Sequence, residues 1–162
     1  RKYLNESVNI QTGGGKLGHT FPYFRLAEIY LNYAEALNEY APGNPDIEHY
    51  VNLVRERSDQ PALPNGLTQD EMRERIRRER RVELAFEEHR AWDVRRWKVA
   101  SSTLGAPLKG MRIERDNTQA TPTYTYTPYV VEQRVFQPKM YWYPIPQSEL
   151  LKLKGWKQNP QW

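Results

Sequence analysis

The segment RLAEIYLNYAEALNEY, residues 25–40, carries the clearest structural pattern in the chain. Its apolar side chains recur at spacings of three and four, the period of one face of an α-helix. This pattern predicts a helix that starts at about residue 25 and ends at Ala41-Pro42-Gly43, because proline and glycine both break helices. The stripe expected to be buried consists of Leu26, Ile29, Tyr30, Tyr33, Ala34, Leu37 and Tyr40.

Two more helices are expected downstream. Asn44 can cap a second helix with Pro45 at its first position, and Ile47, Tyr50, Val51 and Val54 form its apolar stripe. Thr68-Gln69-Asp70-Glu71 has the pattern of a capping box and opens a third helix, expected to reach about Lys98 with a break near Glu88. The three helices are expected to pack through Leu26, Ile29, Tyr33, Leu37, Val51, Val54, Ile76 and Phe86.

The rest of the chain lacks helical periodicity. Residues 1–22, with Gly13-Gly14-Gly15, are expected to form a loop that leads into the helical part, residues 23–99. Residues 100–162 are rich in Pro, Thr, Tyr and Gly and predict an irregular tail. Short strands are expected at Met111–Arg115 and Met140–Tyr143, and a short helix around Ser148–Leu153. The fold class is therefore mainly α with a loop-rich C-terminal tail.

Composition excludes several functions. Cysteine is absent, which removes disulfides and thiolate metal sites. No stretch approaches the roughly 18 uninterrupted apolar residues of a membrane-spanning helix. The net charge is +4, but Glu and Arg alternate in the most charged segment, so no one-signed patch for nucleic acid is expected. Because the chain begins with Arg1 and has no signal-like opening, we expect it to be a piece of a longer protein.

Four segments, in order, carry a family resemblance. They are FRLAEIYLNYAEA at residues 24–36, VNLVRER at 51–57, RERRVELAFEEHR at 78–90 followed by Trp92-Asp93 and Arg95-Arg96-Trp97, and WYPIP at 142–146 leading to Gln158-Asn159-Pro160. Together they resemble the C-terminal portion of SusD/RagB proteins. The chain departs from the family pattern at Asp59, Glu88 and Gln161, where glycine is usual, so the geometry of these three turns stays open.

The resemblance implies a fold and a function. The fold would be a helical scaffold like tetratricopeptide repeats, decorated with irregular loops. Family members are outer-membrane lipoproteins of the bacterial cell surface, which bind oligosaccharides and close over a TonB-dependent transporter of the SusC type. The resemblance implies no cofactor and no enzymatic activity. It places the lipid anchor outside these 162 residues.

Carboxylates and arginines continue the apolar stripe of the third helix. A pair of carboxylates could serve a glycosidase, but such a pair normally flanks a sugar from separate elements. Helical spacing instead favours a structural charge network, expected to contain Glu79, Arg80, Glu83, Glu87, Arg90, Asp93 and Arg96, with Arg55 and Arg57 as further partners if the second helix packs across the third. His19, His49 and His89 are scattered, so no metal site is expected.

Aromatic side chains are the remaining candidates for binding. Tyr124, Tyr126 and Tyr129 lie in a Thr- and Pro-rich stretch without helical period, and could contact glycan or a partner. The alternative is a β-edge packed against the helices. Trp92, Trp97 and Trp142 are expected to fill the core. Two function classes stay open: a glycan-binding surface module, and a helical-repeat scaffold for protein–protein interaction without direct glycan binding.

Overall fold

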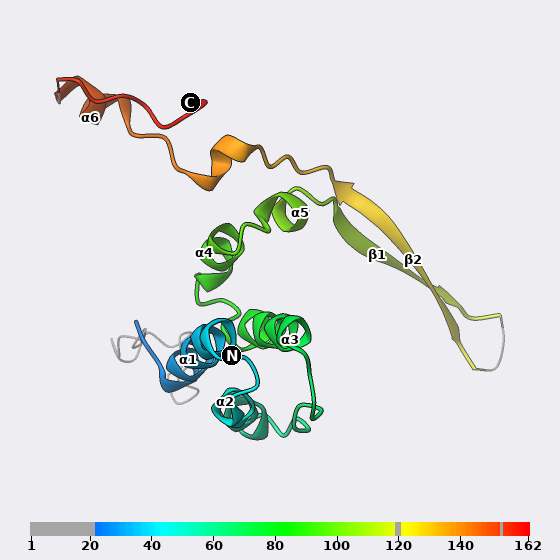
Figure 1. Ribbon diagram of the computed structural model, residues 1–162. Coiled ribbons are helices and arrows are strands. Elements are labelled where there is room, and N and C mark those ends of the chain that lie inside the picture. Colours follow the sequence, from blue (N-terminus) through cyan, green and yellow to red (C-terminus); the bar gives the residue numbers. More distant parts are fainter. Residues whose placement is uncertain (1–21, 119–120, 153) are drawn as a thin grey trace, which may run out of the picture. The chain divides into compact units, whose positions relative to one another are not determined.

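The computed structural model describes residues 22–118, 121–152 and 154–162 (Figure 1). The expected lead-in loop at residues 1–22 therefore lies almost wholly outside the described residues. The chain divides after Glu87 into two compact units, unit 1 up to Glu87 and unit 2 from Glu88 to Trp162. Among the described residues, no helix is long and apolar enough to cross a membrane.

The described residues of unit 1 form three helices, as expected. They are α1 (Leu26–Tyr40), α2 (Pro45–Glu56) and α3 (Gln69–Glu83). The Asn44 side chain accepts a hydrogen bond from the Asp46 amide at 2.9 Å, and Pro45 follows it in the first turn of α2. At α3 the Thr68 side chain and the Glu71 carboxylate satisfy each other's backbone amides. Both predicted caps are confirmed.

The core of unit 1 lies where the three helices meet, which Figure 1 shows side by side. Of the expected core residues, Val51, Val54 and Ile76 are buried and Leu37 is partly buried. The fully buried cluster is completed by Leu31, Ala34, Ile47, Leu63 and Met72. Burial of apolar area in this cluster is the main stabilising contribution to the unit.

The predicted buried face of α1 is wrong in part. Leu26, Ile29, Tyr33 and Tyr40 are exposed, whereas Ala34 is buried as expected and Tyr30 and Leu37 are partly buried. The helix also buries Glu28, Leu31 and Asn38. Nearly every turn of α1 carries apolar residues on two faces, so the three-and-four spacing fits two stripes. Hydrogen bonds favour burial of the stripe that contains Asn38. The Asn38 side-chain amide donates to the Gln69 backbone carbonyl at 3.1 Å, and the Gln69 side-chain amide donates to the Asn38 backbone carbonyl at 2.9 Å.

The third helix does not continue unbroken to Lys98. It ends at Glu83, and α4 (His89–Arg96) begins after a turn over residues 84–88, so the break near Glu88 is confirmed. Phe86, expected in the core, lies in this turn with a positive φ of 65° and is 93% exposed. Because α3 ends three residues earlier, at Glu83, the Phe86 side chain does not continue the apolar stripe of the helix.

Unit 2 contains short elements. After α4 come α5 (Ala100–Leu104), β1 (Leu108–Asp116), β2 (Thr123–Glu132), the 3₁₀ helix η2 (Pro138–Tyr141) and α6 (Gln147–Lys152). The expected strand at Met111–Arg115 lies within β1, and α6 matches the expected short helix up to Lys152. The strand expected at Met140–Tyr143 is wrong, because Pro138 starts a 3₁₀ turn there instead.

Strands β1 and β2 form an antiparallel two-stranded ribbon. The register pairs Ile113 with Tyr126 and Arg115 with Tyr124, and it shifts once, between Leu108 and Lys109. Every residue of β2 is exposed, so within unit 2 this strand is not a β-edge packed against helices. Figure 1 shows the ribbon as two long, twisted strands.

Among the described residues, five that are not glycine adopt the left-handed backbone conformation: Asp59, Phe86, Glu88, Lys98 and Gln161. Asp59, Glu88 and Gln161 have φ values of 54°, 65° and 69°. These are the three positions at which the sequence departs from a glycine-containing family pattern. At these three positions the backbone has the left-handed conformation that glycine adopts without strain, although the residue carries a side chain.

Candidate functional site

Arg25 joins the start of α1 to the end of α3. Its Nε donates to Glu87 Oε2 at 2.6 Å, and its Nη2 donates to the Glu83 carbonyl at 2.6 Å. Its Nη1 also pairs with the Glu83 carboxylate. Desolvation alone would lower the pKa of the Arg25 guanidinium, but hydrogen bonds to Glu87 and Glu83 hold this pKa above its usual value. Both carboxylate side chains are only 7% exposed.

Two arginines of the VNLVRER segment complete the unit 1 network. Arg55 of α2 donates to Glu79 Oε2 at 2.7 Å, and Arg57 donates to Glu83 Oε2 at 2.8 Å. Arg80 is nearly fully buried, forms an ion pair with Glu35 at 3.5 Å and also donates to the Asn32 side chain. The structure thus brings α2 across α3, the condition under which Arg55 and Arg57 were expected to take part.

Sequence reasoning missed Arg25, Glu35 and Asn32. The position of Arg25 in the sequence is the one signal that indicates a partner. Arg25 is the N-cap residue of α1, where its positive charge is unfavourable next to the helix dipole unless a carboxylate from elsewhere in the chain compensates for that charge. In unit 2, Asp93 is buried and accepts from Arg96 at 2.9 Å, while Arg90 is half-buried in α4. Ion pairs of the expected charge network therefore occur in each of the two units.

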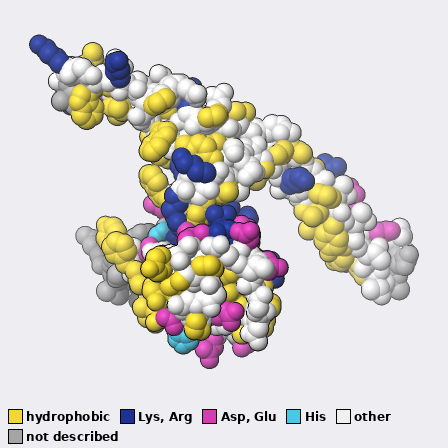
Figure 2. Space-filling model, in the orientation of Figure 1, with side chains coloured by type: hydrophobic (Ala, Val, Ile, Leu, Met, Phe, Trp, Pro, Cys, Tyr) yellow, Lys and Arg dark blue, Asp and Glu magenta, His cyan; other side chains and the backbone are white. Residues whose placement is uncertain are grey.

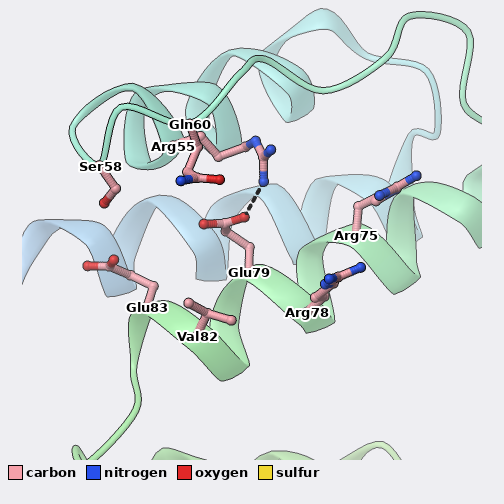
Figure 3. A pocket seen from close by; sticks show the side chains of 8 residues that line it. All are labelled: Arg55, Ser58, Gln60, Arg75, Arg78, Glu79, Val82 and Glu83. Atoms are coloured by element: carbon pink, nitrogen blue, oxygen red, sulfur yellow. Dashed lines mark hydrogen bonds and ion pairs between the residues drawn. The ribbon is translucent and has the colours of Figure 1, made fainter. Parts of the chain in front are cut away.

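A pocket with a volume of about 390 Å³ lies over α3 in unit 1 (Figure 3). It is lined by Arg55, Ser58, Gln60, Arg75, Arg78, Glu79, Val82 and Glu83. Figure 3 shows the bonded pair Arg55–Glu79 in the middle of the pocket, with Arg75 and Arg78 at the side away from Ser58. The pocket is polar and arginine-rich, and no aromatic side chain lines it.

The carboxylates of this pocket have the wrong arrangement for glycoside hydrolysis. Glu79 and Glu83 lie one turn apart on the same helix, and each already accepts hydrogen bonds from arginine. A glycosidase pair flanks the scissile bond from two sides of a cleft, with one carboxyl free to donate a proton. The geometry instead favours a structural role for both side chains.

The ribbon separates the three candidate tyrosines between its two faces. Side chains alternate along a strand, so Tyr124 and Tyr126 share one face and Tyr129 lies on the other. All three are about half exposed. Tyr129 lies against Gly110, where an added Cβ would approach its ring to 2.9 Å, and the Arg112 guanidinium lies 5.8 Å from the ring centre.

A second group of aromatic side chains lies in unit 2. The Arg95 guanidinium is 5.7 Å from the Phe136 ring centre and 5.3 Å from that of Tyr143, and Tyr143 is 6.0 Å from Trp92. The prediction that tryptophans fill the core is wrong for Trp92 and Trp142, which are exposed, while Trp97 is partly exposed. In the described part of unit 2 they contact cations and other rings at the surface, as Trp142 does with Lys98 at 5.3 Å.

The Gln158-Asn159-Pro160 motif closes back on the WYPIP segment. The Gln158 side chain accepts from the Ile145 amide and donates to the Ile145 carbonyl, both at 2.8 Å. Asn159 donates to the Tyr143 carbonyl at 2.7 Å. The two motifs are separated in sequence but are held together by these hydrogen bonds.

No cluster of metal-ligating side chains occurs within residues 22–118, 121–152 and 154–162. The histidine expectation rests partly on His19, which lies outside the described residues. His49 contacts Tyr50, with ring centres 5.1 Å apart, which is an ordinary aromatic packing contact.

The helical scaffold and the motifs that stabilise it define a SusD-like class of protein. The model of the SusD family matches residues 1–162, and the chain belongs to this family. SusD-like protein P2 of Formosa agariphila is 43% identical over 111 residues, which are 64% of this chain and 22% of that protein.

Solved structures agree with this assignment and with the tetratricopeptide-like fold. A SusD-like protein of Bacteroides fragilis is 34% identical with a TM-score of 0.72, over 86% of this chain and 25% of that one. A SusD-like carbohydrate-binding protein of the same species is 30% identical with a TM-score of 0.70, over 92% of this chain and 31% of that one. The chain thus spans between a fifth and a third of these relatives.

Proposed function

We propose that this chain is the C-terminal portion of a non-enzymatic lipoprotein of the bacterial outer membrane, exposed at the cell surface. The whole protein binds oligosaccharides and delivers them to a TonB-dependent transporter of the SusC type. The observation that carries the proposal is the family match along all 162 residues. A relative that is similar over 92% of this chain is described as carbohydrate-binding, which supports the ligand class.

Within this chain, Tyr124, Tyr126 and Tyr129 are the proposed contacts to glycan or to the transporter. Their support is exposure, because a tyrosine ring in contact with solvent can stack on a sugar or anchor a protein interface. The unit 1 network has a structural role in this proposal, with Glu79, Glu83 and Glu87 each bonded to arginine rather than directed at a substrate.

The test uses the full-length protein and a panel of oligosaccharides. Binding is measured by calorimetry, and the same sugars are analysed by mass spectrometry after long incubation. We expect at least one oligosaccharide to bind and every oligosaccharide to remain intact. Hydrolysis by wild type that Glu83→Gln abolishes would reject the non-enzymatic role.

The second candidate is a helical-repeat scaffold that binds a partner protein without direct glycan contact. The exposed apolar side chains on the ribbon favour it. Association with the transporter, combined with no binding to any oligosaccharide of the panel, would select this candidate over the first.

A further inference from the structure

Two arginines that line the pocket over α3 have no ion-pair partner in the described part of the chain. Arg75 and Arg78 lie at the side of this pocket that faces away from Ser58 (Figure 3). Both side chains are exposed, and neither forms an ion pair or a side-chain hydrogen bond with a described residue. Residues three apart are neighbours on the surface of a helix, so two positive charges are close together here.

The carboxylates within helical reach of Arg75 are engaged elsewhere. Glu71, four residues before it, accepts from the Thr68 hydroxyl at 2.7 Å and from the Thr68 amide at 2.9 Å. Arg75 acts on this carboxylate only at longer range, through electrostatics. Glu79, four residues after Arg75, accepts from the Arg55 guanidinium at 2.7 Å.

The surroundings of Arg78 are similar. Glu74, four residues before it, pairs with Arg77 at 3.1 Å, and the residue four positions after it is the apolar Val82. Side chains of both charges lie on the surface of unit 1, as Figure 2 shows for the face turned to the viewer. The pocket is therefore a local excess of positive charge on a surface of mixed charge.

The rest of the lining suits a polar ligand that carries hydroxyl groups. The pocket volume of about 390 Å³ is within the range of small-molecule sites, roughly 300–1,000 Å³. The exposed Gln60 amide has no hydrogen-bond partner among the described residues, and an amide can donate to one hydroxyl and accept from another. Among the described residues, no aromatic ring lines the pocket, so charge rather than ring stacking would select the ligand.

A protein segment packed over this pocket would match it poorly. Val82 is the one apolar side chain among the residues that line it, so a covering segment would gain little from hydrophobic contact. Removing Arg75 and Arg78 from water would also be costly unless carboxylates met both charges. A small anionic ligand supplies the negative charge and leaves the guanidinium groups partly hydrated.

We propose that this pocket binds an acidic oligosaccharide through a carboxylate or sulfate group held between Arg75 and Arg78. A planar guanidinium donates paired hydrogen bonds to the oxygens of such a group, which fixes its orientation as well as its charge. Gln60 bonds the neighbouring sugar hydroxyls. This inference rests on the proposed function, in which the whole protein binds oligosaccharides, and it narrows the ligand to sugars with negative charge.

The experiment measures the affinity of the full-length protein for acidic oligosaccharides and for their neutral counterparts. The panel contains oligouronates, sulfated oligosaccharides, and the same sugars after methyl esterification or desulfation. We expect at least one acidic sugar to bind and its neutral counterpart to bind about tenfold more weakly or worse, as for the loss of hydrogen bonds to a charged group. Added salt should weaken the acidic sugar's binding, because it screens exposed charges.

Two variants test whether the pocket is the binding site. The double variant Arg75→Gln/Arg78→Gln removes both charges and is expected to bind the acidic sugar about tenfold more weakly or worse. Arg81→Gln is the matched control, since Arg81 is exposed on the same helix and has no partner in the described chain, but does not line the pocket. It is expected to leave the affinity unchanged. Melting temperatures should stay the same in both variants.

Other outcomes would overturn the inference in distinguishable ways. Neutral sugars that bind as well as acidic ones, or better, retain the proposed function and reject the charge-selective pocket. Acidic-sugar affinity that is unchanged in the double variant, or lowered equally by Arg81→Gln, means that this pocket is not the binding site. Wild type that binds no acidic sugar, together with a lower melting temperature of the double variant, means that the protein's own carboxylates occupy the pocket. Failure to bind any sugar rejects the proposed function, and this inference with it.

Discussion

At the scale of single residues, Glu83 connects three parts of unit 1. Its carboxylate pairs with Arg25 before α1 and with Arg57 after α2, while its own helix is α3. It is 7% exposed, and a buried carboxylate is tolerated only when its partners compensate for lost hydration. One side chain therefore ties the ends of three helices together.

Replacing this carboxylate should be costly for stability. Glu83→Gln removes one of the two carboxylates that pair with Arg25, which keeps Glu87, and we expect a loss of about 2 kcal/mol, between the values for buried and exposed ion pairs. Arg57 is 62% exposed, so it can return to water and limit the loss. Thermal melts of the full-length protein measure the effect.

The matched control is Glu74→Gln on the same helix. Glu74 pairs with Arg77 at 3.1 Å but is 73% exposed, so its loss should change stability by about 0.5 kcal/mol or less. Equal melting temperatures for the two variants would show that the Glu83 pairs contribute nothing.

Glu88 tests backbone strain at a single residue. Its φ of 65° is a conformation that disfavours a side chain by about 1–2 kcal/mol, whereas glycine adopts it freely. Glycine also gains freedom in the unfolded chain, so Glu88→Gly is expected to stabilise the protein by a net amount of about 0.5–1 kcal/mol. In contrast, Glu74→Gly inside α3 should lose about 1 kcal/mol. A fall in melting temperature for both would show that the Glu88 turn is not strained.

At the scale of elements, helix caps can be predicted from sequence because they act within a few residues. The caps at Asn44 and Thr68 involve neighbours in sequence, so their residue types predict their contacts. The sequence alone does not determine which face of α1 is buried, because the helix has two apolar stripes and partners on α2 and α3 decide between them. The same limit applies to Arg25, whose partners are 58 and 62 residues away.

The strands show this limit from another side. Alternation in TYTYT fits a strand, but only the register reveals that Tyr129 lies across from Gly110 while Tyr126 lies across from Ile113. The sequence could therefore name three exposed tyrosines without separating them by face. Pro138 indicates a turn, whereas the aromatic residues that follow it favour a strand, and the structure has the 3₁₀ turn.

A contact between α1 and α3 gives a prediction for pH. Arg73 of α3 holds Glu39 of α1 with bonds of 2.5 and 2.7 Å, which lowers the pKa of Glu39 below its usual value of 4.5. A lowered pKa stabilises the fold at pH values above 4.5, and this contribution is lost as the pH falls through the folded-state pKa. The pair is partly exposed, so it contributes about 0–1 kcal/mol.

Melting temperatures of wild type and Glu39→Gln should therefore differ at pH 6, and the difference should shrink as the pH falls below 4.5 and through the lowered pKa of Glu39. Glu56→Gln is the control, since Glu56 is exposed at the end of α2 and the described residues offer it no ion pair. A difference between wild type and Glu39→Gln that persists at low pH would mean that the variant acts through packing rather than charge.

At the scale of the whole molecule, the two units differ in how much core they have. Unit 1 buries a continuous hydrophobic cluster from all three helices, together with Leu84 at the end of α3. In the described part of unit 2, the buried hydrophobic residues are Val94 and Ala100. Most apolar side chains of unit 2 lie on the surface, including those of the ribbon and Trp92, Trp142 and Trp156.

This difference predicts how the separated units behave. A fragment of residues 1–87 should fold on its own, because its cluster removes enough apolar area from water to compensate for chain entropy, although a domain of this size is marginal. A fragment of residues 88–162 should not, since the two buried apolar side chains of its described part and an exposed ribbon cannot do the same. Circular dichroism during heating measures both: the first fragment should lose helix in one sigmoidal transition, and the second should change gradually.

Ile76→Ala in the first fragment removes a fully buried side chain and should abolish its transition, because the expected loss of about 2–5 kcal/mol exceeds the stability of so small a domain. A sigmoidal transition in the second fragment would show that the surface aromatic and cation contacts of unit 2 stabilise it without a buried core.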